Sequence, residues 1–152
     1  MSLAMSGSMR FSAVLFLITM AGCSSAGPDQ TPAVRIQVEQ RSQSDVLHFA
    51  GPINLQYDIM VTNSSDQPLT LRRIELRTVG AGAYSLRNDS TPVNLAIPPG
   101  GTVSKMINAW GYARGGNLAA EEPVTLRAIA YFDGPTGSFV RIVSENITQG
   151  SR

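Results

Sequence analysis

The sequence predicts an all-β protein, an antiparallel β-sandwich of about seven to eight strands. Three observations lead to this fold class. Apolar and polar residues alternate over several short segments, turns rich in Gly, Pro, Asn and Asp separate these segments, and no segment keeps the period of a helix. The chain has 152 residues, 43% of them hydrophobic and 15% charged, which suits one globular domain with its own core.

The first two expected strands show the clearest alternation. Val34, Ile36 and Val38 alternate with Arg, Gln and Glu. In the stretch INLQYDIMV, residues 53–61, apolar side chains stand at every second position. Because the side chains of a strand point alternately to its two faces, each stretch has one apolar face to bury. We therefore predict strands over 34–38 and 53–61.

The next segment, PLTLRRIELRT, changes its parity halfway. Leu69 and Leu71 lie on one face of an extended chain, whereas Ile74 and Leu76 fall on the other face. The change occurs at the doubled arginine, positions 72–73. One extra residue in a strand restores a single apolar face, so the sequence predicts a β-bulge at this doublet.

The remaining strands are shorter or less regular in the sequence. A short strand over 93–97 is closed by PPGG, and another strand begins at Thr102. The stretch VTLRAIAYF, residues 124–132, has one apolar side throughout, and DGPTGS after it is typical of a hairpin loop that leads into the strand FVRIV. The stretch GGNLAAEEP, residues 115–123, could hold one helical turn.

This order of elements resembles that of immunoglobulin-like and fibronectin-like modules of cell envelopes. The resemblance rests on YDIMVTNSSDQPLTLRRIEL, a strand, polar turn and strand, and on the later corner IPPGG. It spans most of residues 33–148 and implies an immunoglobulin-like β-sandwich, an architecture rather than a family. Residues 149–152 are expected to form a tail. No cysteine follows Cys23, so apolar burial alone is expected to stabilise the domain.

The N-terminus has the composition of a cleaved signal peptide. Arg10 precedes an apolar run over residues 11–20, after which small residues lead to Cys23, the single cysteine of the chain. The run is shorter than the ~20 apolar residues that cross a bilayer as a helix. We therefore predict a signal peptide over residues 1–22, whose true start could also be Met5 or Met9.

The end of this segment resembles the lipobox of bacterial lipoproteins. The residues that carry the resemblance are Met20-Ala21-Gly22-Cys23, with Met20 in place of the usual Leu. The resemblance implies that Cys23 is lipidated and becomes the first residue of the mature chain. An ordinary secretory cleavage after Ala26 is the alternative, because Ser24-Ser25-Ala26 also fits a small-x-small site.

A lipidated cysteine implies a partner and a location. Residues 23–32 are small, polar and proline-containing, which suits a flexible tether between the membrane and the domain. In Gram-negative lipoproteins an Asp after the cysteine favours the inner membrane, and here Ser24 occupies that position. We expect a lipid-anchored protein of the cell envelope, held at the outer membrane and facing the periplasm.

Charge and composition argue against several activities. The 12 basic and 11 acidic residues leave no strongly basic surface, so no nucleic-acid partner is expected. His48 is the single histidine and Cys23 has no second cysteine, so no metal site and no cofactor are expected. No serine stands in a nucleophile motif, and we predict that His48 is an exposed residue of an edge strand and that the protein is not an enzyme.

The stretch MINAWGYARGGNLAA, residues 106–120, is the candidate for a binding surface. Trp110, Tyr112 and Arg114 share one parity and would lie on one face of an extended chain. These residue types are enriched at binding hot spots because they give a large contact area with few rotors. The alternative is that Trp110 is the buried core tryptophan of the sandwich and that Tyr112 covers it.

Two classes of function follow from these features. The first is a non-enzymatic interaction or structural module, anchored at the membrane and monomeric, with an unknown envelope protein or ligand as its partner. The alternative is a periplasmic protein that binds a ligand or inhibits an enzyme through its loops. An anchored scaffold would lose its partner without Cys23, whereas an inhibitor would keep it.

Overall fold

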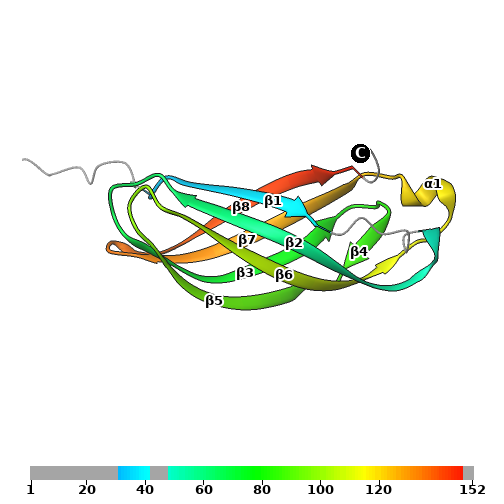
Figure 1. Cartoon of the computed structure of the whole chain (residues 1–152), viewed down its shortest axis with the longest axis horizontal. Coiled ribbons are helices and arrows are strands. Elements are labelled where there is room, and N and C mark those ends of the chain that lie inside the picture. The colour runs from blue at the N-terminus through cyan, green and yellow to red at the C-terminus, as the bar shows by residue number, and fades with distance from the viewer. Residues whose placement is uncertain (1–30, 42–47, 149–152) are drawn as a thin grey trace, which may run out of the picture. The chain divides into compact units, whose positions relative to one another are not determined.

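Eight strands and one short helix make up the part of the chain that the computed structural model describes, residues 31–41 and 48–148 (Figure 1). The chain divides into two units, residues 1–30 and 31–152, and the described residues belong to the second. The predicted signal peptide, Cys23, most of the tether and the tail at 149–152 lie outside the described residues. The elements, in chain order, are β1 (Val34–Gln40), β2 (Gly51–Asn63), β3 (Leu69–Val79), β4 (Tyr84–Leu86), β5 (Asp89–Ile97), β6 (Thr102–Ala113), α1 (Asn117–Ala120), β7 (Val124–Gly134) and β8 (Gly137–Ile147).

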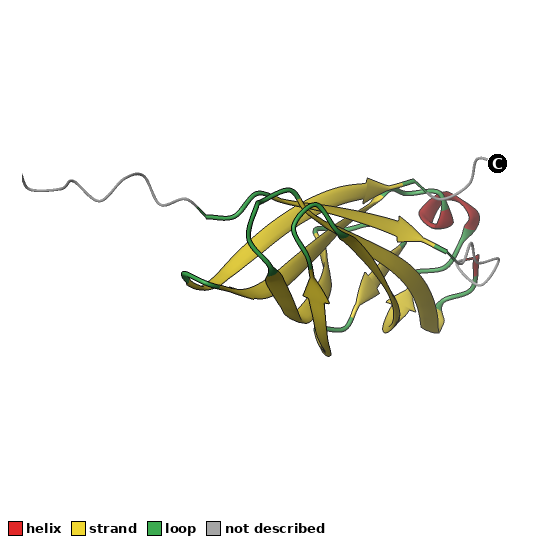
Figure 2. Ribbon diagram, turned by 60° about the vertical axis from the view of Figure 1, so that its left-hand side comes forward, coloured by secondary structure: helices red, strands yellow, loops and turns green. Residues whose placement is uncertain are grey.

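The strands form two four-stranded antiparallel sheets, with the orders β1-β2-β6-β4 and β5-β3-β7-β8. Figure 2 shows these sheets as two layers of strands. The adjacency of β1, β2 and β6 in one sheet and of β3, β7 and β8 in the other corresponds to strands A, B, E and C, F, G of immunoglobulin domains. The predicted all-β, immunoglobulin-like antiparallel sandwich is confirmed.

The core lies between the two sheets and consists of the residues that the alternation predicts. In β2, every second residue from Ile53 to Val61 is at most 4% exposed. In β7, every second residue from Val124 to Phe132 is at most 1% exposed. Each large apolar side chain buried in this way contributes roughly 1.5–3 kcal/mol relative to an exposed one. The period-two pattern therefore supplies the main stabilising term of the domain.

The β-bulge predicted in β3 is confirmed. The register shifts between Leu71 and Arg73 against both neighbouring strands, β5 and β7. Leu71 and Ile74 are buried, whereas Arg72 and Arg73 are both exposed. The bulge thus keeps the apolar face of β3 inward and places two consecutive arginines on the outer face of the sheet.

One polar side chain, that of Asn63 at the end of β2, is buried among the described residues. Its Nδ2 donates to the carbonyl oxygens of Gln67 at 2.7 Å and of Ile97 and Pro98 at 3.2 Å. Its Oδ1 accepts hydrogen bonds from the backbone N and the hydroxyl of Ser65. Asn63 therefore satisfies the backbone of both the β2–β3 turn and the β5–β6 corner, as a buried polar group must.

The first and last strands of the domain contact each other across the two sheets (Figure 1). Arg141 of β8 reaches the segment just before β1, where its Nη2 donates to the carbonyl oxygens of Pro32 at 2.9 Å and Thr31 at 3.4 Å. The same guanidinium lies over the Phe139 ring, 5.5 Å from its centroid. The entry of the chain into the sandwich is thereby tied to its final strand.

Smaller features differ from the sequence-based expectations. The predicted helical turn within 115–123 is confirmed as α1, and the strand expected over 93–97 begins earlier, at Asp89. His48 is exposed as predicted, but it lies in a short turn ahead of β2 and not in an edge strand, so that part of the expectation is wrong. That turn is held by the His48 carbonyl oxygen, which accepts a hydrogen bond from the Gly116 backbone N at 2.9 Å.

Candidate functional site

Strand β6 presents an aromatic surface on the outer face of its sheet. Trp110 is 54% exposed and Tyr112 is 55% exposed, and Met106 on the same side of the strand is 56% exposed. Met60 of β2 adds a further side chain, 43% exposed. We call Met106, Trp110 and Tyr112 the aromatic face. Large apolar side chains exposed this close together are uncommon on a soluble domain and are typical of contact surfaces.

The neighbouring strands frame the aromatic face with small and polar residues. In the register of β2 and β6, Asn54 lies opposite Trp110, and Pro52 lies opposite Tyr112. On the other side of β6, Ser85 of β4 pairs with Tyr112. The two rings therefore stand on a regular strand between paired neighbours, which fixes the backbone beneath them.

Burial of Trp110 in the core, the alternative interpretation of the sequence, is wrong. The inward side of β6 carries small residues at this level, namely Ala109, Gly111 and Ala113, and β4 pairs with β6 from Gly111 to Ala113. A Cβ built on Gly111 would lie 2.4 Å from the Ser85 carbonyl oxygen. Only glycine fits at that position, and it separates the two outward aromatic rings.

Arg114, the third residue of the predicted surface, makes contacts within the domain. It directly follows β6, its Nη1 forms an ion pair with Glu122, and it donates to the Gly82 carbonyl oxygen at 3.3 Å. Its backbone N also donates to Ala83. Arg114 thus connects the end of β6 to the β3–β4 and α1–β7 connections. Its participation in partner binding, like that of Trp110 and Tyr112, stays a prediction.

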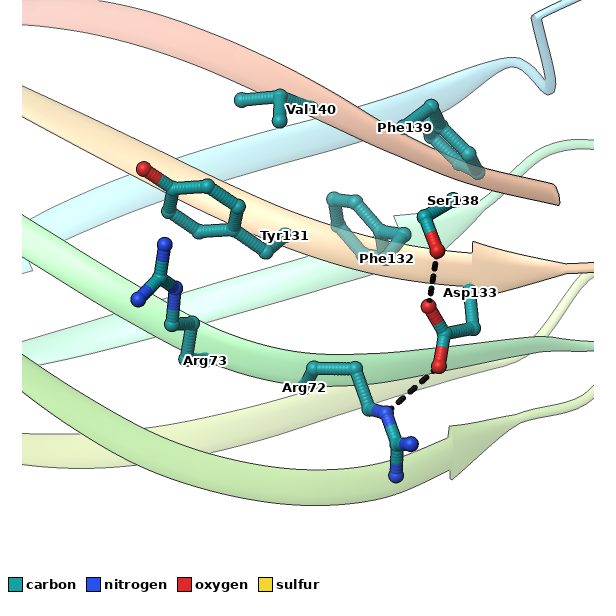
Figure 3. A pocket seen from close by; sticks show the side chains of 8 residues that line it. All are labelled: Arg72, Arg73, Tyr131, Phe132, Asp133, Ser138, Phe139 and Val140. Carbon is teal, nitrogen blue, oxygen red and sulfur yellow. Dashed lines mark hydrogen bonds and ion pairs between the residues drawn. The ribbon is translucent and has the colours of Figure 1, made fainter.

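A shallow pocket of about 240 Å³ lies on the other sheet, where the bulge of β3 meets β7 and the start of β8 (Figure 3). The Arg73 guanidinium stands over the Tyr131 ring, 3.8 Å from its centroid. Arg72 Nε lies 2.6 Å from an Asp133 carboxylate oxygen. The pocket therefore has one aromatic wall, one apolar wall at Val140, and two guanidinium groups along its edge.

The carboxylate of this pocket is held in its charged form. Ser138 donates a hydrogen bond to Asp133 at 2.7 Å, and this bond, together with the nearby charge of Arg72, lowers the pKa of Asp133 below its ordinary value of 3.8 (Figure 3). Asp133 therefore orients Arg72 over the whole neutral range. The guanidinium groups and the Tyr131 ring of this pocket suit the binding of a ligand through ion pairs and ring stacking.

The described residues meet neither of two simple requirements, a cluster of metal ligands and a membrane-spanning helix. No group of three or more His, Cys, Asp or Glu side chains that could hold a metal ion occurs among them. No helix within residues 31–41 and 48–148 is long and apolar enough to cross a bilayer.

Sequence reasoning missed the pocket, although two signals pointed toward it. The bulge at 72–73 was visible as a change of parity, and a bulge re-aims side chains toward one face. The hairpin DGPTGS fixes which residues of β7 and β8 are neighbours, and in the structure Asp133 pairs with Ser138. What the sequence did not reveal is that β3 lies next to β7, because that pairing joins segments about sixty residues apart.

The fold and the two surfaces define a class, an immunoglobulin-like β-sandwich that presents an aromatic face on one sheet and an arginine-edged pocket on the other. No protein-family model matches this chain, and no curated protein matches it either. Among solved structures, the Northeast Structural Genomics Consortium target SoR45 is similar to it with a TM-score of 0.52 and 12% identity, over 82% of this chain and 89% of that chain.

Two further solved structures resemble the chain more distantly. A protein from Archaeoglobus fulgidus has a TM-score of 0.47 and 8% identity, over 79% of this chain and 100% of that chain. The GAE domain of yeast GGA1 has a TM-score of 0.43 and 18% identity, over 78% of this chain and 95% of that chain. At such identities the likeness concerns the fold alone, and function has to be argued from this chain's own residues.

Proposed function

We propose that this chain is a bacterial envelope lipoprotein, anchored through an acylated Cys23, whose sandwich is a non-enzymatic interaction module. The main observation in favour of an interaction module is the aromatic face, where Trp110 and Tyr112 are each more than half exposed. Exposed Trp and Tyr on a regular strand give a large, rigid contact area whose ordering on binding costs little entropy. The partner is expected to be an envelope protein or an extended ligand that covers this face.

The anchor is supported by the sequence Met20-Ala21-Gly22-Cys23 and by the spacing that follows it. Seven residues, 24–30, separate Cys23 from the first described residue, Thr31. An extended chain of that length spans at most about 25 Å. Two or three acyl chains on Cys23 would hold the protein stably, because each buried methylene contributes about 0.8 kcal/mol.

The anchor is tested by mass spectrometry of the membrane-extracted protein. Wild-type protein should carry a diacylglyceryl-modified N-terminal cysteine at residue 23, and Cys23→Ser should leave unprocessed precursor or an unacylated soluble form. Ser24→Ala is the matched control and should remain acylated. A mature chain that begins at Gly27 without lipid would show an ordinary secretory cleavage and would refute the anchor.

The interaction surface is tested with a photo-crosslinking residue at one position of each sheet. A benzophenone amino acid at Tyr112 should trap one discrete partner in intact cells, whereas the same group at Ile142, which is 62% exposed on the opposite sheet, should not. Trp110→Ala should reduce trapping at position 112 without unfolding the domain. Equal trapping at both positions, or trapping that survives Trp110→Ala, would argue against the aromatic face.

A second candidate is a ligand-binding or enzyme-inhibiting protein of the periplasm, which the arginine-edged pocket favours. Such a protein would act through Arg73 and Tyr131 and would not need the membrane. The Cys23→Ser protein discriminates between the two candidates. A soluble form that keeps its partner supports the second candidate, and one that loses its partner supports the anchored module.

A further inference from the structure

Two arginines lie side by side on the outer face of the β5-β3-β7-β8 sheet, away from the pocket at the bulge. Arg77 of β3 is directly opposite Arg127 of β7 in the antiparallel register. Side chains opposite each other in such a pair have their Cβ atoms about 4.5–5.5 Å apart, and like charges at that spacing destabilise a sheet. Both side chains are partly buried, so water screens their repulsion only in part.

The Arg77 side chain also carries a donor that no described residue satisfies. Its Nε is buried and has no hydrogen-bond partner within residues 31–41 and 48–148. Buried donors in folded proteins nearly always have an acceptor, and an unsatisfied one destabilises the fold. An acceptor placed beside Arg77 would remove this cost and the repulsion together.

Two carboxylates of the same sheet, those of Asp133 and Glu75, form ion pairs with other arginines. Arg72 pairs with Asp133 at 2.6 Å, and Arg73 pairs with Glu75 at 3.4 Å. Glu75 lies on the same face as Arg77, two residues along β3, and its carboxylate pairs with Arg73. No ion pair of Arg77 or Arg127 occurs among the described residues. The doublet at the bulge is thus compensated, whereas the Arg77 and Arg127 pair is not.

The Ser144 hydroxyl lies beside this pair of arginines, so that three polar side chains form a row across β3, β7 and β8. Ser144 of β8 lies opposite Arg127, and Arg127 Nε donates to the Ser144 Oγ at 3.4 Å. Because that oxygen accepts from Arg127, its own hydrogen is available to a further acceptor. Across β3, β7 and β8, this row therefore offers two guanidinium groups and one hydroxyl, all of them donors.

We propose that Arg77, Arg127 and Ser144 form a binding site for a phosphate group, carried either by free phosphate or by a small phosphate ester. A carboxylate has two oxygens and is matched by one guanidinium fork, whereas a phosphate has further oxygens for a second fork and a hydroxyl. The negative charge between the arginines replaces their repulsion by two attractions. This site shares no residue with the aromatic face, and its argument does not depend on acylation of Cys23, so it stands whether or not the proposed function does.

The test follows the arginine Nε–H signals of the full-length protein by NMR while inorganic phosphate is added at constant ionic strength. The signals of Arg77 and Arg127 should move together and saturate with a millimolar dissociation constant, and sodium chloride should not move them. Glycerol phosphate distinguishes the source of the group. Binding at least as tight as that of inorganic phosphate indicates an ester ligand, and weaker binding indicates free phosphate.

Matched variants make the result specific. Arg77→Gln and Arg127→Gln should each weaken phosphate binding about tenfold or more, and Ser144→Ala should weaken it less. Arg35→Gln, an exposed arginine of β1 in the other sheet, should leave binding unchanged. Shifts that do not saturate, or an equal loss in Arg35→Gln, would reduce the effect to general charge screening and overturn the site.

Thermal unfolding gives a second readout that also reports on folding of the variants. Without phosphate, Arg127→Gln should have a melting temperature equal to or above that of the wild type, because a like-charge pair is removed. At a tenfold excess of phosphate over its dissociation constant, the wild type should gain about 3–6 °C, and Arg127→Gln should gain almost nothing. A parallel gain in both proteins would overturn the proposal.

Discussion

At the scale of single residues, two tyrosine hydroxyls meet inside the sandwich. Tyr57 of β2 donates to the hydroxyl of Tyr84 of β4 at 2.8 Å, and Tyr84 donates in turn to Gln40 Oε1 at 2.7 Å. Burial, more than the contact with Tyr84, raises the pKa of the Tyr57 phenol far above its ordinary value of 10.0. The Tyr57 phenol is therefore neutral over the ordinary pH range, and the two hydrogen bonds connect the short strand β4 to β1 and β2.

The direction of this chain of hydrogen bonds predicts unequal effects of two similar substitutions. Tyr84→Phe removes the acceptor of a fully buried hydroxyl and should lower the free energy of unfolding by about 1–3 kcal/mol. Tyr57→Phe removes only a donor, leaves the bond from Tyr84 to Gln40 intact, and should cost about 0.5–1.5 kcal/mol. Urea unfolding of both variants measures the difference. The reverse order would show that the Tyr57 hydroxyl finds another acceptor when the Tyr84 hydroxyl is removed.

A second prediction concerns pH and the Asp58 carboxylate. Hydrogen bonds from Arg41 and then Ser104 lower the pKa of Asp58 below its ordinary value of 3.8. Since the folded pKa lies below the unfolded one, the stabilisation is complete above pH about 4 and is lost as the pH falls through the folded pKa. NMR titration of the carboxyl carbon should show the pKa of Asp58 moving up in Arg41→Gln and unchanged in Arg35→Gln. An unshifted pKa in Arg41→Gln would exclude this ion pair as the cause.

At the scale of elements, the sequence predicts those strands in which apolar and polar residues alternate over many positions. β2 and β7 each keep one apolar parity over nine residues or more, and even the bulge of β3 is visible because both flanking parities are apolar. The three-residue strand β4 has no period to detect. In the first part of β5, Asp89, Ser90 and Pro92 are exposed and Thr91 is partly buried, because an edge strand buries little there.

A substitution at Gly111 tests how closely β4 approaches β6, its neighbour in the sheet. Gly111→Ala places a methyl group 2.4 Å from the Ser85 carbonyl oxygen, which is backbone and has to move. The free energy of unfolding should fall by about 1–3 kcal/mol or more. Asn108→Ala, on the exposed side of the same strand, is the control and should change it by less than about 0.5 kcal/mol. If Gly111→Ala were as stable as the control, β4 would not pack on β6 as closely as described.

At the scale of the whole molecule, the sequence predicts the layers but not which outward residues become neighbours. The sequence shows which side of β6 faces outward, because Thr102, Ser104 and Asn108 lie on the same side as Trp110 and are polar. That signal argued against a core tryptophan. By contrast, Arg77 and Arg127 are fifty positions apart, and only the register of β3 against β7 makes them a pair. Local alternation fixes the face of a residue, whereas long-range register fixes its partners.

The contact between Arg141 and the segment before β1 has a mechanical consequence. A pull on the chain ahead of Thr31 acts first on the bonds from the Arg141 guanidinium to the carbonyl oxygens of Thr31 and Pro32. Force is therefore shared between β8 and the β1–β2 ladder, which belong to different sheets. In single-molecule pulling from residue 30, Arg141→Gln should open at a lower force than the wild type, and Arg127→Gln should not. Equal opening forces would show that the β1–β2 ladder bears the load alone.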